Sequence, residues 1–175
     1  MLITGAAWLF GDNINTDLMC PNDALKAPVA ERKKFVFRAN RPGWSEQVKE
    51  GDIIVGGTNF GTGSGRPGSQ YLRELGIAAI VAESISGLFF RNSVNYALPV
   101  VECPGIMAAT SEGDLLSVDL NSGAVVNTVT RARLQGTPMP SFLQDIIAAG
   151  GLLESLRRQG LLEMPAARVI NPAGR

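Results

Sequence analysis

Short apolar runs alternate with segments of helical periodicity between residues 51 and 104. The apolar runs are GDIIVGG (51–57), IAAIVAE (77–83) and LPVVECP (98–104), and their length and composition are typical of buried strands. Between them lie SQYLRELG (69–76) and SISGLFFRNSVNYA (84–97), which favour helices, and Gly76 is placed to end the first. This strand-helix-strand-helix-strand order predicts a parallel sheet built from two right-handed crossovers.

The flanking segments predict an antiparallel element beside this parallel layer. Residues 112–134 alternate apolar and polar side chains around Asn-Ser-Gly, which indicates a hairpin. Residues 140–160 predict an amphipathic helix that is broken at Gly150-Gly151 and followed by a second short helix. Residues 1–60 favour strands and loops, with 27–44 as a mobile or weakly helical connector. The predicted fold class is therefore α/β, with parallel βαβ units plus an antiparallel hairpin.

Composition limits the kinds of partner that such a chain binds. Its 175 residues are the size of one domain, which we expect to span 1–162 and to end in a loose tail at 163–175. Sixteen basic and sixteen acidic residues cancel, which disfavours nucleic acids and anionic membranes as partners. The sequence contains no apolar run of membrane-spanning length and no basic residue ahead of the first apolar run. We therefore expect a cytoplasmic protein.

The chain contains no histidine, and this restricts its chemistry. A Ser-His-Asp triad, a Cys-His pair and a histidine metal site are excluded within this chain. The two cysteines, Cys20 and Cys103, are too few for a thiolate metal site, and we expect them to be buried and unpaired. Acid-base chemistry must come from carboxylates, lysine, tyrosine, an activated serine or a partner chain.

The glycine-rich stretch GTNFGTGSGRPGSQ (57–70) contains a possible dinucleotide fingerprint, with Glu83 where a ribose-binding acid would lie. Three glycines, Gly63, Gly65 and Gly68, fit the G-x-G-x-x-G spacing. In dinucleotide-binding folds, however, the first glycine directly follows the strand, whereas six residues intervene here. The pattern also lacks the Gly-Lys-Ser/Thr ending of a phosphate-binding loop and the spacing of a hydrolase nucleophile elbow. A dinucleotide site is therefore disfavoured.

The same loop has features that favour a small carboxylic acid as its ligand. A glycine-rich loop before a helix offers backbone N–H groups to an anion. Arg66 can hold a carboxylate through two parallel hydrogen bonds, and Ser64 beside it would have its alkoxide form stabilised, as a base requires. The alternative is a tight turn that needs glycine and carries a surface arginine.

Four motifs in order resemble the small-subunit family of isopropylmalate dehydratase, within the aconitase superfamily. NFGTGSGRPG (59–68) resembles the family's Asn-Phe-Gly-Cys-Gly-Ser-Ser-Arg-Glu-His loop, and GDNINTD (11–17) resembles its N-terminal Gly-Asp-(Asp/Asn)-Ile-Asp-Thr-Asp segment. Residues 76–104 resemble the stretch that ends in Phe-Arg-Asn-x-x-Asn-x-x-Leu-Pro, and residues 134–160 resemble the closing helix with its double glycine. Together these motifs span roughly residues 10–160.

The resemblance implies a swivelling β/β/α three-layer domain and an enzyme of leucine biosynthesis. It implies a separate large subunit that carries a 4Fe-4S cluster, in a heterodimer or heterotetramer, with no cofactor bound by this chain. The implied reaction is reversible loss of water from a branched hydroxy di- or tricarboxylic acid. The cluster's open iron would act as a Lewis acid on the substrate.

The resemblance also assigns roles by position. Ser64 falls on the family's base serine, Arg66 on its carboxylate-binding arginine, and Asp17 on its active-site aspartate. We expect Gly63 and Gly65 to contribute to substrate binding, although Gly65 stands where the family has a second serine. Asp23 occupies a position at which many relatives carry a cation, and Lys26 is near enough in sequence to substitute. Other departures are Thr62 for the loop cysteine and Pro67-Gly68 for Glu-His.

Three hypotheses follow from the sequence. The first is a hydro-lyase subunit that is active only with its large subunit. The second is a degenerate relative that binds a carboxylate or a partner without catalysis, as the changed loop residues suggest. The third, already disfavoured, is a dinucleotide-binding domain. For Arg91 and Asn92 we expect structural roles, either facing the large subunit or capping internal carbonyls.

Overall fold

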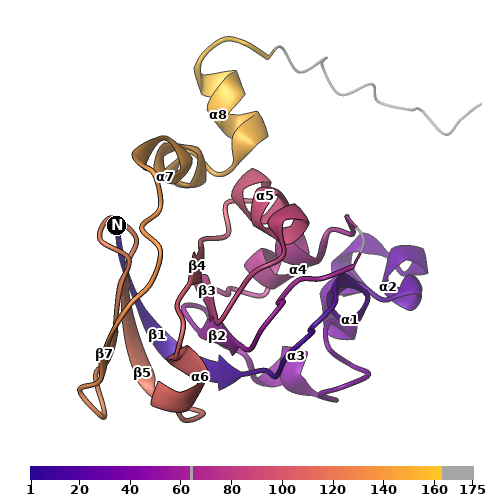
Figure 1. Ribbon diagram of the computed structural model, residues 1–175. Coiled ribbons are helices and arrows are strands. Elements are labelled where there is room, and N and C mark those ends of the chain that lie inside the picture. Colours follow the sequence, from indigo (N-terminus) through magenta and orange to yellow (C-terminus); the bar gives the residue numbers. More distant parts are fainter. Residues whose placement is uncertain (64, 163–175) are drawn as a thin grey trace, which may run out of the picture.

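A single mixed sheet organises the computed structural model, which describes residues 1–63 and 65–162 (Figure 1). In the described residues the strands run in the order β4-β3-β2-β1-β5-β6-β7. Their bounds are β1 Leu2–Leu9, β2 Ile53–Gly56, β3 Ala79–Ala82, β4 Val100–Glu102, β5 Leu115–Asp119, β6 Ala124–Asn127 and β7 Arg133–Gln135. Neighbours from β1 to β4 are parallel, and neighbours from β1 through β5 and β6 to β7 are antiparallel. The predicted parallel layer and the hairpin are both confirmed.

The first strand belongs to both halves of the sheet. Residues 2–6 pair with β5 in antiparallel register, from Leu2 opposite Asp119 to Ala6 opposite Leu115. The last three residues of β1 pair with β2 in parallel register, ending with Leu9 opposite Val55. Because β1 passes from one half to the other along its length, the sheet curls and the two halves face each other (Figure 1).

Side chains of the parallel strands alternate between two cores. Ile54 on β2 and Ile80 on β3 belong to the core beneath the helices. Their neighbours Ile53 and Val81 belong to a second core, which they share with strands β5 and β6. The parallel strands are therefore the middle layer between helices and antiparallel strands, which confirms the β/β/α architecture.

Helices cover the outer face of the parallel half (Figure 1). The crossover helices are α4 (Gly68–Glu74) and α5 (Gly87–Asn95), as predicted. The same side carries α1 (Thr16–Met19), α2 (Asn22–Lys26), the 3-10 helix η1 (Val29–Phe35) and α3 (Trp44–Gln47). The remaining helices are α6 (Ile106–Ala109), α7 (Ser141–Ala148) and α8 (Leu152–Arg158). The break between α7 and α8 falls at the predicted glycine pair.

Residues 27–44 are more than the connector that the sequence predicted. The segment does contain weak helix, as η1, but Phe37 and Trp44 at its end are fully buried. Their rings lie 5.1 Å apart between centroids, and both pack against Phe10 after β1. The sequence does not reveal this apolar cluster. Its residues lie among charged neighbours and follow neither helical nor strand spacing.

Two of the expectations concern residues that the structure leaves undescribed. Ser64 lies outside the described residues, and so does the predicted tail at 163–175. Within residues 1–63 and 65–162, the structure has no helix of the length and hydropathy required to cross a membrane.

Candidate functional site

The glycine loop, residues 57–68, leaves β2 and runs beside the segment that follows β1. The Gly57 N–H donates to the Gly11 carbonyl at 3.2 Å, and the Gly61 N–H donates to the Ile14 carbonyl at 2.7 Å. Thr16 N–H returns a bond to the Thr62 carbonyl at 2.9 Å. These backbone bonds join segments that are far apart in sequence, and they bring the start of α1 to the loop.

Helix α1 starts at the loop because an asparagine caps it. The Asn15 side-chain oxygen accepts from the N–H groups of Asp17 and Leu18 at 3.0 and 3.1 Å. This is the bonding that asparagine provides at helix N-termini, where the first N–H groups lack intrahelical partners. Asn15 was not among the predicted site residues, although Asn before Thr-Asp is itself a recognisable capping pattern. The cap fixes the backbone from which Asp17 projects.

Asp17 and Arg66 form an ion pair, so the structure brings these two predicted site residues together. Arg66 Nε lies 2.9 Å from Asp17 Oδ1, and Arg66 Nη1 donates to the Cys20 carbonyl at 2.9 Å. The Arg66 side chain is 23% exposed, whereas that of Asp17 is 58% exposed. Two protein contacts therefore hold the guanidinium plane, and Nη2 has no hydrogen-bond partner within the described residues.

Behind the ion pair lie two buried groups that stay uncharged. Burial raises the pKa of the Cys20 thiol, although the Tyr71 hydroxyl and the Arg66 charge oppose this shift. Burial also raises the pKa of Tyr71, and the neighbouring Cys20 adds to that effect. A protonated thiol is a poor nucleophile and a poor metal ligand. Cys20 therefore supports the site through its carbonyl.

The other predicted site residues are placed differently. Gly63 and Gly65 are exposed in the loop, and Gly63 has a φ of 105° that strongly favours glycine. Lys26 is the exposed last residue of α2, and no described ion pair joins it to Asp17. Ser64, which lies outside the described residues, comes between the two glycines in the sequence.

Helix α5 packs directly against the glycine loop. A Cβ added at Gly61 would overlap the Phe89 ring, so glycine is required for this approach. One turn further along α5, the Asn92 Nδ2 lies 3.8 Å from the position of a Cβ added at Gly65. Asn92 is half-buried and caps no carbonyl among the described residues, contrary to one of the roles expected from the sequence. No feature of a single sequence could have placed it at the loop.

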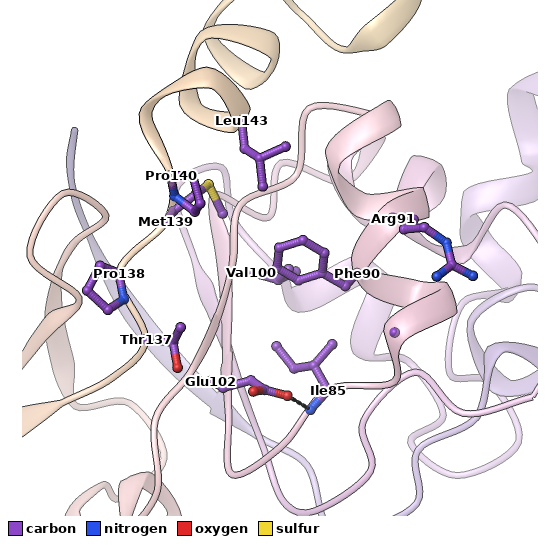
Figure 2. Close-up of a pocket in the computed structure, with 11 residues that line it drawn as sticks. Ile85, Phe90, Arg91, Val100, Glu102, Thr137, Pro138, Met139, Pro140 and Leu143 are labelled. Carbon is purple, nitrogen blue, oxygen red and sulfur yellow. Dashed lines mark hydrogen bonds between the residues drawn. The ribbon is translucent and has the colours of Figure 1, made fainter.

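A pocket of about 470 Å³ lies on the opposite face of α5 (Figure 2). Phe90 from α5, Val100 from β4 and Leu143 from α7 line it, and Glu102 accepts a hydrogen bond from the Ile85 N–H at 2.7 Å. Because an α-helix has 3.6 residues per turn, the pocket-lining residues of α5 point away from those that meet the loop. This cavity is largely apolar and is separate from the ion pair.

The proposed ribose-binding acid of a dinucleotide site has a structural role instead. Both carboxylate oxygens of Glu83 are occupied, since Oε2 accepts from the Gly105 N–H at 2.7 Å and Oε1 from the Met107 N–H at 2.9 Å. Glu83 thereby anchors the start of α6. Glu83 is therefore not available to bind a ribose, which further disfavours the dinucleotide hypothesis.

Comparisons with known proteins match most of the chain. The aconitase C-terminal domain family matches residues 11–104. A 3-isopropylmalate dehydratase small subunit 1 from Methanopyrus kandleri is 41% identical over 161 residues, which cover 91% of this chain and 95% of that protein. An isopropylmalate/citramalate isomerase small subunit from Methanocaldococcus jannaschii is 40% identical over 90% of this chain and 95% of its own. The crystal structure of a 3-isopropylmalate dehydratase from that organism superposes with a TM-score of 0.83 at 31% identity, over 92% of this chain and 96% of the other.

Proposed function

This chain belongs to the aconitase superfamily, as a member of the 3-isopropylmalate dehydratase small-subunit family of hydro-lyases, and we propose that it completes an active site whose remainder lies on a large subunit. The observation that carries this proposal is the Asp17–Arg66 ion pair, set at the glycine loop with one guanidinium nitrogen that no described residue uses. The active assembly is then a heterodimer or a heterotetramer.

We place the 4Fe-4S cluster of this reaction on the large subunit. The described residues contain no group of three or more side chains suited to hold a metal ion. Cys20 and Cys103 lie in different cores, and burial raises the pKa of both thiols, that of Cys103 to about 11. The donor set of the described part of this chain therefore does not fit a cluster. When bound on the partner, the cluster supplies a Lewis acid for the substrate hydroxyl.

Arg66 is proposed to hold a carboxylate of the substrate. Nε and Nη1 are anchored on Asp17 and on the Cys20 carbonyl, which fixes the orientation of the guanidinium before substrate arrives. The unused N–H groups on the Nη side can donate to one carboxylate in a two-pronged contact. Asp17 thus orients the arginine, and its second oxygen, which no described residue contacts through a hydrogen bond, stays available to the substrate.

Ser64 is proposed as the base that takes the carbon-bound proton. With no histidine in the chain, serine needs another source of activation. Support comes from its sequence neighbours, since backbone N–H groups of the loop and the Arg66 charge favour an alkoxide. Removal of this proton and loss of hydroxide from the adjacent carbon leave a double bond between the two carbons. In the hydration direction the same serine returns the proton.

The substrate is proposed to be a branched hydroxy di- or tricarboxylic acid. Glycine at position 65 and aspartate at position 23 change the side chains expected around such a substrate. Asp23 forms an exposed ion pair with Arg38 at 2.7 Å, so its own charge is compensated. Isopropylmalate, dimethylmalate and a citramalate are the acids to test first. We propose a cytoplasmic location, where two unpaired cysteines are normal.

The loop changes also favour a second candidate, a non-catalytic carboxylate-binding subunit. Gly65 and Pro67-Gly68 remove a hydroxyl, a carboxylate and an imidazole relative to the family pattern. Such a chain would keep the ion pair and the partner but would have lost turnover.

Anaerobic co-purification with a large subunit of the same enzyme family tests the proposal. After cluster reconstitution, dehydration of the acid panel is followed by the ultraviolet absorbance of the new double bond. We expect turnover that Ser64→Ala abolishes, and Arg66→Lys chiefly raises KM, since lysine cannot make the two-pronged contact. A stable cluster-bearing complex that is silent on every acid favours the non-catalytic candidate, and failure to form any complex rejects both.

A further inference from the structure

The loop leaves an open space at Gly65, and Asn92 borders it. Among the described residues beyond its chain neighbours, the Asn92 Nδ2 is the only heavy atom within 4 Å of a Cβ added at Gly65. The contact distance of 3.8 Å is an ordinary van der Waals separation, and the backbone of Gly65 is not left-handed. Neither sterics nor backbone geometry requires glycine here, so the absence of a side chain leaves room for another group.

Two contacts fix the face of α5 on which Asn92 lies. Phe89, which precedes Asn92 by three residues on α5, packs on Gly61. Ser93 follows Asn92, and its hydroxyl hydrogen-bonds the Ser69 hydroxyl of α4 at 2.9 Å, with both serines fully buried. Because α5 is anchored to the loop and to α4 on either side of Asn92, the helix backbone from which this side chain projects is held in position before any ligand binds.

Among residues 1–63 and 65–162, the Asn92 amide is a donor without a partner. Its half-buried side chain makes no hydrogen bond within the described part of the chain, although a carboxamide offers two N–H groups. We propose that Asn92 is a substrate-contacting residue whose Nδ2 donates to a carboxylate oxygen of the hydroxy acid, which enters the space left by Gly65. This inference rests on the proposed function and deepens it. One substrate carboxylate then contacts Arg66, and a second contacts α5.

The test compares variants in the reconstituted complex with the large subunit. Asn92→Ala removes the donor and keeps a good helix former. Asn95→Ala is the matched control, because it is the same change one turn along α5 at an exposed residue that lines a different pocket. Gly65→Ser places a hydroxyl in the open space, alone and combined with Asn92→Ala. The measurements are kcat and KM for the preferred acid and the melting temperature of each complex.

Loss of one hydrogen bond to a charged acceptor predicts a rise in KM of roughly tenfold or more for Asn92→Ala. The value of kcat and the melting temperature should remain close to those of Asn95→Ala. In the Asn92→Ala background Gly65→Ser should recover part of the loss, because truncation of Asn92 leaves room for the carboxylate beside the new hydroxyl, which can donate to it. The two substitutions should therefore not be additive. Equal KM values for Asn92→Ala, Asn95→Ala and the unaltered chain would overturn the inference.

A binding measurement separates this inference from the proposed function. The probe is 2-isopropylsuccinate, a diacid without the hydroxyl, titrated calorimetrically into the unaltered and Asn92→Ala complexes. A complex without turnover that binds the probe, and binds it about tenfold more weakly with Asn92→Ala, keeps the Asn92 contact while refuting catalysis. Equal binding by the two complexes overturns the contact. If the unaltered complex binds neither this probe nor any acid of the panel, both proposals are rejected.

Discussion

Alanine at each of three neighbouring loop glycines should have three different effects on stability. Gly61 and Gly63 have φ values of 77° and 105°, in the left-handed region, whereas Gly65 does not. A Cβ at Gly61 would also overlap the Phe89 ring, and one at Gly63 would lie 3.2 Å from the Thr16 hydroxyl oxygen. At Gly65 the nearest group is the Asn92 amide at 3.8 Å.

The expected sizes follow from these differences. Gly65→Ala should stabilise the chain slightly, by up to about 0.5 kcal/mol, because alanine restricts the unfolded chain. Gly63→Ala forces an L-residue into left-handed backbone and should cost about 1–2 kcal/mol. Gly61→Ala adds overpacking against a fixed ring to the same backbone cost, so roughly 2–5 kcal/mol should be lost.

Urea unfolding of the three variants, followed by circular dichroism, measures this order. Gly11→Ala is the control, since a Cβ there meets nothing within 4 Å and its φ is not left-handed. If the three variants had equal free energies of unfolding, or if Gly65→Ala were as unstable as Gly61→Ala, the account of how α5 approaches the loop would be refuted. A Gly61→Ala variant as stable to urea as the unaltered chain would show that the Phe89 ring is free to move.

The remaining predictions concern the ion pair, a buried hydroxyl pair and alkaline stability. Asp17→Asn should lower the melting temperature by about 2 °C or less, because the pair is partly exposed, yet reduce turnover of the complex roughly tenfold by releasing Arg66. Ser69→Ala alone should cost about 1–3 kcal/mol in urea unfolding, because it orphans the buried Ser93 hydroxyl, whereas the double alanine variant should cost less than the single changes combined. Burial raises the pKa of Cys103 from 9.0 to about 11, so the folded chain holds a proton that the unfolded chain releases. The free energy of unfolding should therefore fall between about pH 9 and pH 11, with a shallower slope in Cys103→Ala.

The parallel half of the fold could be predicted because its signals are local. IAAIVAE and the helical run before it report strand and helix through composition and spacing alone. The role of Phe37 and Trp44 could not be predicted in this way, because their burial depends on contact with Phe10 across the chain. Local signals also could not predict that β1 pairs with both halves of the sheet. Leu2, at the start of this strand, is 68% exposed and still pairs with β5.

At the site, the sequence could nominate residues by type and motif but could not give their positions. Arg66 and Asp17 were identified by residue type and motif, and the structure places them 2.9 Å apart. The contribution of the Cys20 carbonyl follows from backbone direction, which residue identity does not encode. Asn92 reaches the loop only because Gly61 admits Phe89, and that dependence between distant residues is invisible in a single sequence.

The shared strand β1 also determines when the domain can become complete during synthesis. Its residues 2–6 leave the ribosome well before their antiparallel partner, which extends to Asp119. Until then the nascent chain can form only the parallel half, with one side of β1 unpaired and prone to wrong pairing. A slow final step, the docking of the late hairpin onto an early strand, should therefore limit the rate of folding.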